Sequence, residues 1–130
     1  MSGSRPQQRI ASLLEEVARQ GSYEEILVTT GDGFPIASSS GDYVASENLA
    51  GVCALFDDVV ERTERDLGMA RVDELTVVDG RRGRLVIRPV PFVSDQRLFV
   101  VVRLNVRGTW RRNTNQLCRD LARLFSEAEV

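Results

Sequence analysis

RLFVVVRLNV, residues 97–106, is the stretch that decides the fold. In a β-strand alternate residues share one face. All the residues on the first face of this stretch are apolar: Leu98, Val100, Val102, Leu104 and Val106. Phe99 and Val101 make much of the second face apolar too. A strand that is apolar on both faces must be covered on both. The stretch therefore predicts a central strand with helices above and below it.

Length and composition limit the domain organisation and the partners. The chain has 130 residues, of which 42% are hydrophobic, enough for one domain with its own core. We expect residues 1–5 to form a polar tail and residues 6–130 a single domain. The formal net charge is −2, and the 17 basic residues, all arginine, are spread along the chain. This balance argues against nucleic acid as a partner, because phosphate binding needs a concentrated basic surface.

The residue types that are missing exclude much of catalytic chemistry. The sequence contains neither His nor Lys, so a Ser-His-Asp triad, a His metal site, a phosphate-loop lysine and a Schiff base are all excluded. Cys53 and Cys118 have no CxxC companion, and we interpret them as small buried thiols in a reducing compartment. We expect no enzyme activity, catalytic residue, cofactor or metal. The absence of a long apolar run argues against membrane insertion and favours the cytoplasm.

The order of the remaining patterns predicts an α+β domain. Apolar residues at helical or strand spacing predict eight elements, with helices at 6–21, 43–67 and about 109–127 and strands at 23–30, 34–39, 72–79, 84–93 and 97–106. Gly31-Asp32-Gly33 reads as a hairpin turn that needs a positive φ, and Pro35 indicates an edge strand. We predict one five-stranded antiparallel sheet sandwiched between helices.

The long helix has a wide apolar stripe and a charged face. The stripe comprises Leu49, Val52, Cys53, Phe56, Val59, Val60, Thr63 and Leu67. The opposite face, which meets water or a partner, carries Glu47, Asp57, Asp58, Glu61, Arg62, Glu64 and Arg65. Either Asp42 or Ser46 caps the start of the helix, and Thr109 is the candidate cap of the last helix. Gly51 is either tolerated drift or a point where a second backbone approaches closely.

The chain resembles the roadblock (dynein light-chain) family over almost its whole length. The resemblance lies in ILVTTGDGFPIASS at 26–39, in VASENLAGV at the start of the long helix, and in TVVDGRRGRLVIRPV followed by RLFVVVRL. It implies a roadblock/profilin-like fold and an obligate dimer, which we expect to be a homodimer, with a paralogue as the alternative partner. In the family, the third strands of two subunits pair and the second helices pack together. Carried onto this chain, the dimer interface comprises Leu49, Val52, Phe56, Val59, Glu74, Leu75, Thr76, Val77 and Val78.

The resemblance also implies a function. Roadblock proteins regulate or scaffold Ras-like small GTPases, and bacterial members of the MglB and MglC type control the polarity of gliding motility. We expect this chain to bind such a GTPase or another roadblock protein, and its length is nearer to MglC-like members. The candidate partner surface comprises Asp57, Asp58, Glu61, Arg62, Arg65, Arg81 and Arg82. Charges that are merely solvated on a helix face and a hairpin tip would give the same sequence pattern.

Two other functional classes remain open at this stage. A small-ligand sensor would have a cavity of several hundred Å³ between sheet and helix, lined by residues such as Phe99 and Val101. A minor enzyme would have to use Asp or Cys without His, with Cys53 and Cys118 as its best nucleophiles. A filled core distinguishes the roadblock platform from the sensor.

Overall fold

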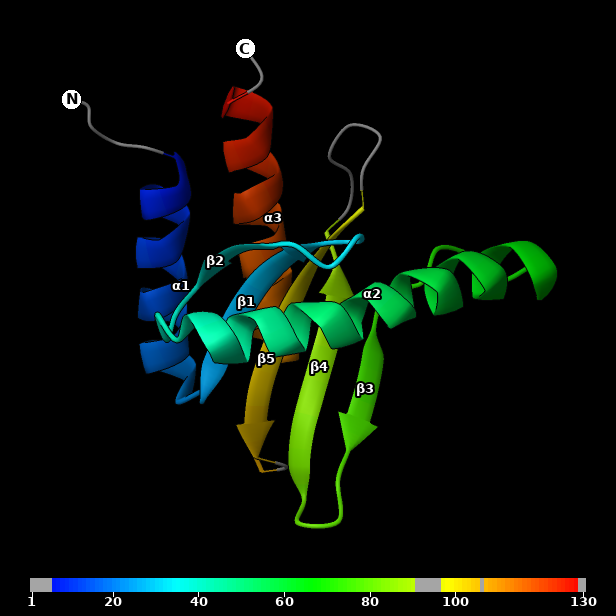
Figure 1. Ribbon diagram of the computed structural model, residues 1–130, viewed down its shortest axis with the longest axis horizontal. Coiled ribbons are helices and arrows are strands. Elements are labelled where there is room, and N and C mark those ends of the chain that lie inside the picture. The colour runs from blue at the N-terminus through cyan, green and yellow to red at the C-terminus, as the bar shows by residue number, and fades with distance from the viewer. Residues whose placement is uncertain (1–5, 91–96, 106, 129–130) are drawn as a thin grey trace.

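The computed structural model of the protein describes residues 6–90, 97–105 and 107–128, and these form a five-stranded sheet with three helices (Figure 1). The predicted order of elements is confirmed: α1 (Pro6–Gly21), β1 (Glu25–Thr30), β2 (Pro35–Ser38), α2 (Tyr43–Asp66), β3 (Leu75–Val78), β4 (Gly83–Pro89), β5 (Leu98–Asn105) and α3 (Arg111–Ala128). The strand order is β2-β1-β5-β4-β3, and all neighbours are antiparallel. β5 is therefore the central strand, as its sequence predicts.

Both faces of β5 are buried. Leu98, Val100, Val102 and Leu104 belong to the core cluster on the α1 and α3 side, while Phe99 and Val101 belong to the cluster beneath α2. α1 and α3 lie behind the sheet in Figure 1, and α2 crosses its front. Burying these side chains is the main stabilising contribution, roughly 1.5–3 kcal/mol for each large apolar group.

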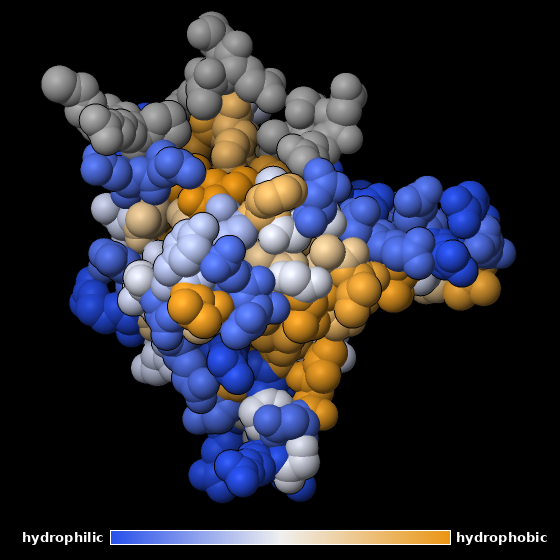
Figure 2. All heavy atoms as spheres, in the orientation of Figure 1, coloured by the Kyte–Doolittle hydropathy of each residue, from blue (hydrophilic) through white to orange (hydrophobic). Residues whose placement is uncertain are grey.

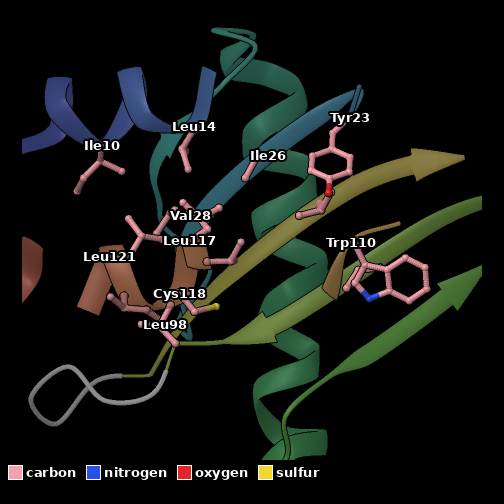
Figure 3. Packing of buried hydrophobic residues seen from close by; sticks show 14 of the residues in the cluster. Ile10, Leu14, Tyr23, Ile26, Val28, Leu98, Trp110, Leu117, Cys118 and Leu121 are labelled. Atoms are coloured by element: carbon pink, nitrogen blue, oxygen red, sulfur yellow. The ribbon is translucent and has the colours of Figure 1, made fainter. Parts of the chain in front are cut away.

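The cluster behind the sheet is formed by two amphipathic helices. Ile10 and Leu14 of α1 face Leu117 and Leu121 of α3 (Figure 3). Helical residues three or four positions apart share a face, so each helix presents one apolar stripe to the sheet. Because these stripes pack together, they fix the position of α3 relative to β4.

The start of α2 is fixed by a side-chain cap. Asp42 accepts the backbone N–H of Ala45 at Oδ1 (3.1 Å), which decides between the two candidate caps in favour of Asp42. Ser46 is instead buried one turn inside the helix. The predicted turn with positive φ before β2 is confirmed at Gly33 (φ 94°), and Pro35 lies on an edge strand as expected.

Two predicted boundaries were wrong. The first backbone hydrogen bond of α3 runs from the Thr114 N–H to the Trp110 carbonyl (2.8 Å). Trp110, and not Thr109, therefore occupies the N-cap position. β3 covers only Leu75–Val78 of the expected strand 72–79, because the residues before it are held by the side chains of Arg88 in β4 and of Trp110, just before α3. Our predictions for residues 1–5, 91–93 and 106 lie outside the described residues.

Cys53 and Cys118 are both free and buried, in agreement with their interpretation as core thiols. Burial raises the pKa of Cys53 to about 12 and that of Cys118 to about 11, because a thiolate would lose its hydration. Both thiols therefore keep their protons at neutral pH, which makes them poor nucleophiles.

We expect alkaline pH to destabilise the fold through these thiols. The folded state holds each proton above pH 9, where the unfolded chain releases it, so stability falls as pH rises from about 9 towards the folded pKa values. The loss should approach about 1.4 kcal/mol per pH unit for each thiol. Urea denaturation between pH 8 and pH 10.5 measures it, and a Cys53→Ala/Cys118→Ala chain should show a flatter profile. Equal slopes for the two chains would contradict the assignment.

Candidate interaction surface

β3 leaves one side of the sheet unpaired among the described residues. Asp79 donates its backbone N–H to the Gly83 carbonyl (2.9 Å) at the end of the β3–β4 ladder. Bonded and non-bonded pairs alternate along an antiparallel ladder, so Thr76 and Val78 direct their backbone N–H and C=O groups away from β4. β3 has no Pro, Lys or bulge of the kind that usually protects an edge. This edge is open to another strand.

The face of α2 that points away from its own core is apolar. Val52 and Val59 are each 45% exposed and Leu55 is 70% exposed. Positions 52, 55 and 59 share one helix face. Gly51 lies on the exposed surface, and a Cβ added there would meet no atom within 4 Å. The approach of a second backbone at Gly51, if it occurs, must therefore come from another chain.

The C-terminal part of α2 extends beyond β3 (Figure 1). We call residues 57–66, together with 67–74 that lead back to β3, the arm. Figure 2 shows that the edge of the projecting helix nearer β3 is hydrophobic, while its other edge is hydrophilic. Leu67 and Met69 add exposed apolar surface there. Exposed apolar residues that gather next to an open strand edge are typical of a protein interface.

An open groove of about 690 Å³ lies between the N-terminal half of α2 and the sheet. Leu49 and Val52 form its helical side, and Val77 and Leu85 lie on its strand side. Arg81 and Arg103 also line it. The groove therefore has an apolar lining with charged groups beside it, and it adjoins the open edge.

The residues predicted for a dimer interface are brought to this one surface, but unequally. Val52, Val59, Val77 and Val78 are exposed, whereas Leu49, Phe56 and Leu75 are partly buried against the cluster beneath α2. Thr76 is exposed on β3. Sequence reasoning missed Leu55, which is more exposed than either neighbouring valine. The sequence did contain a signal for it, because Leu55 is a large apolar residue outside the predicted apolar stripe.

Glu74, which was predicted for the pairing edge, lies one residue before β3, and its side chain is bonded within its own chain. Its carboxylate accepts hydrogen bonds from Trp110 Nε1 (2.8 Å) and from the Thr76 hydroxyl (3.0 Å). Trp110 is buried, and the guanidinium groups of Arg84 and Arg111 lie 4.5 and 5.1 Å from its ring centroid. Trp110 therefore serves packing and holds Glu74 in place.

The predicted charged surface divides into three parts. Asp57 is only partly exposed and pairs with Arg97 Nη1 (2.7 Å), so it holds β5 to α2 and does not belong to the free face. Asp58 pairs with Arg62 and Glu61 with Arg65, all of them exposed. Arg81 and Arg82 lie at the β3–β4 hairpin tip, and their side chains make none of the contacts found for the other charged residues. These tip arginines are available for a partner.

A buried arginine fixes the segment that leads into β3. Arg88 of β4 donates to the Asp73 carbonyl (2.9 Å), to the Thr114 hydroxyl (2.6 Å) and to the Asn115 side chain (2.7 Å). Its guanidinium also lies 3.2 Å from the Asp73 carboxylate. A buried cation needs such partners, and here they join β4, α3 and the arm. This network therefore holds the residue two positions before β3 against β4 and α3.

The chemistry available on this surface is recognition. Within the described ranges, no three His, Cys, Asp or Glu side chains gather where they could hold a metal ion. None of the helices in those ranges has the length and apolarity that crossing a bilayer requires. What the surface offers is an open strand edge, an apolar helix face and unpaired arginines.

Comparison with known proteins shows the fold of the chain. No protein-family model and no curated protein sequence matches it. Among solved structures, MglB of Myxococcus xanthus is 14% identical, with 98% of this chain and 95% of that chain covered, at a TM-score of 0.79. A roadblock/LC7 domain from Streptomyces avermitilis is 13% identical (92% and 93% covered, TM-score 0.65). MglC of M. xanthus is 21% identical (93% and 98% covered, TM-score 0.53). The chain has the roadblock fold.

We expect Arg88→Met to loosen the arm and destabilise the protein. The change removes hydrogen bonds from a buried cation to Thr114, Asn115 and Asp73, with an expected cost of about 2–4 kcal/mol. Urea denaturation measures the free energy of unfolding, and Arg19→Met is the matched control because Arg19 of α1 is exposed and pairs with exposed Glu16 on the same helix. The control should change stability by less than about 0.5 kcal/mol. Equal effects would refute the role of Arg88.

Proposed function

We propose that the protein is a non-enzymatic roadblock homodimer that regulates or scaffolds a Ras-like small GTPase, directly or through another roadblock protein. The observation that carries this proposal is the open β3 edge lying beside the exposed apolar face of α2. An unprotected edge and an apolar helix face are both hazards for a monomer. One twofold axis removes both hazards.

In this dimer the β3 strands of two copies pair antiparallel and extend the sheet across the axis. The outward-facing groups of Thr76 and Val78 then gain hydrogen-bond partners. The two α2 helices lie on the same side of the extended sheet, so Val52, Leu55 and Val59 of each copy pack against the other copy. The 690 Å³ groove receives the partner's helix. Such an isologous interface uses the same surface patch twice.

The likeness to MglB and MglC supports a role in gliding motility or a related form of cell polarity. The length of the chain favoured an MglC-like protein, but the TM-score is higher for M. xanthus MglB than for M. xanthus MglC. We therefore propose a regulator of the MglB/MglC type and drop the narrower preference. We also propose a cytoplasmic location, where two unpaired thiols remain reduced.

The ligand-sensor alternative receives less support. It required a cavity lined by Phe99 and Val101, but both side chains are fully buried in the cluster with Leu27 and Ile87. The open groove beside α2 is lined by residues other than Phe99 and Val101, and it is open to solvent. A large open groove next to an unpaired edge suits a protein segment better than an enclosed small molecule.

We expect Leu55→Arg to dissociate the dimer while the monomer remains folded. Leu55 is 70% exposed in one chain, so arginine costs little there, but in the proposed interface it would bury an unpaired charge. Light scattering should give a dimer mass for the unaltered protein and a monomer mass for the variant. Phe34→Arg is the matched control, since Phe34 is 67% exposed in the turn before β2 and should leave the dimer intact. A monomeric unaltered protein at micromolar concentration contradicts the proposal.

We expect the unaltered protein to bind a Ras-like GTPase encoded in the same genome, and Leu55→Arg to bind it at least about tenfold more weakly. The GTPase would bind a surface to which both copies of the dimer contribute, and a monomer would offer only half of that surface. Titration by fluorescence anisotropy, with the GTPase loaded with GDP or a GTP analogue, measures the affinity. A parallel titration with a second roadblock protein present separates direct from indirect contact. Failure to bind under both conditions refutes the GTPase role and leaves the dimer standing.

A further inference from the structure

This inference rests on the proposed homodimer, because the dimer determines where the β3–β4 hairpin tip of each copy lies. When one strand pairs antiparallel with its own copy, the residues that follow it lie beside the residues that precede it in the other chain. The tip, residues 79–83, follows β3. The arm precedes β3. The tip of one copy therefore meets the arm of the other, and each dimer contains this contact twice.

The tip is rigid and basic. One Oδ1 atom of Asp79 accepts the backbone N–H groups of both Arg81 (2.9 Å) and Gly83 (2.8 Å), and this ties the loop together. Arg82 has φ 70°, a left-handed conformation that usually favours glycine in such loops. The hairpin thus keeps an arginine at a position where glycine would be less strained. The side chains of Arg81 and Arg82 are exposed and find no acidic partner in their own chain within the part that the structure describes.

The arm is acidic and is hollowed where the tip would lie. The arm, residues 57–74, contains seven carboxylates against three arginines, a formal charge of −4. Arginines from outside the arm pair with Asp57, Asp73 and Glu74, so the exposed acids of α2 supply the remaining negative charge. An open groove of about 660 Å³ is lined by the unbroken run 69–76, by Val60 and Thr63 of α2, and by Arg111. The groove lies along the segment that must neighbour the tip of a second copy. The negative end of the α2 dipole also favours cations at this end of the helix.

We propose that Arg81 and Arg82 of one copy bind the acidic arm of the second copy, so that two reciprocal charge contacts decide which chains pair. The apolar faces of α2 supply the bulk of the burial, but an apolar surface alone does not select its partner. Charges at the rim of an interface act mainly on specificity and association rate. In this protein the tip and the arm of one chain carry opposite charge, so the chain is complementary to itself.

Two charge-reversed chains test this proposal. The tip chain carries Arg81→Glu/Arg82→Glu, and the arm chain carries Glu61→Arg/Asp66→Arg. The tip chain alone brings like charges together at both contacts, and the arm chain alone loses the attraction at both because its arm becomes formally neutral. Each homodimer should therefore dissociate at a higher concentration than the unaltered one, by about tenfold or more for the tip chain. A mixture of the two restores the unaltered attraction at one contact and removes the repulsion at the other. Native mass spectrometry of the mixture should show heterodimer well above the statistical half, and about 1 M NaCl should reduce this preference.

A control pair separates the contact from net charge. Arg9→Glu/Arg19→Glu and Glu15→Arg/Glu16→Arg make the same formal changes on the exposed side of α1, and their mixture should remain statistical. Should a reversed chain fail to fold, Arg81→Gln/Arg82→Gln tests the same contact through its weakened dimerisation. Statistical mixing of tip and arm chains that dimerise like the unaltered protein overturns the contact and leaves the homodimer standing. An unaltered protein that is monomeric overturns both.

Discussion

Every layer of this protein depends on one strand that is apolar on both faces. Because β5 cannot meet water on either side, the chain must place helices in front of the sheet and behind it. β1 and β4 flank β5, which leaves β2 and β3 as the two edges. The positions of the open edge and of α2 beside it both follow from covering this strand.

The two edges of the sheet have different chemistry. β2 begins with Pro35, which has no backbone N–H to offer, whereas β3 has a full set of backbone groups. Arg88 and the pair formed by Glu74 and Trp110 hold the segment before β3 in place, so the open edge is fixed in position. A rigid edge loses little freedom when it pairs with another strand. The interface that we propose is therefore largely formed within a single chain.

Periodicity predicted all eight elements because burial patterns at spacings of 2 and 3.6 residues are local. It could not distinguish which apolar residues of α2 face the sheet, because apolar residues such as Leu55 also occur outside the predicted stripe. Leu55 was missed for this reason. The bond between Asp57 and Arg97 could not be predicted either, because the two residues lie 40 positions apart in the sequence. Nothing local in the sequence reveals the bond between Glu74 and Trp110 either.

The sequence by itself determined the order of the elements, the central place of residues 98–104 and the exclusion of histidine and lysine chemistry. Each of these depends on composition or on neighbours within a few positions. Only the tertiary structure decided that β3 is the open edge, that Val52, Leu55 and Val59 lie exposed beside it, and that Arg88 ties the arm to α3. These facts depend on contacts between distant segments, which form only when the helices cover both faces of the sheet.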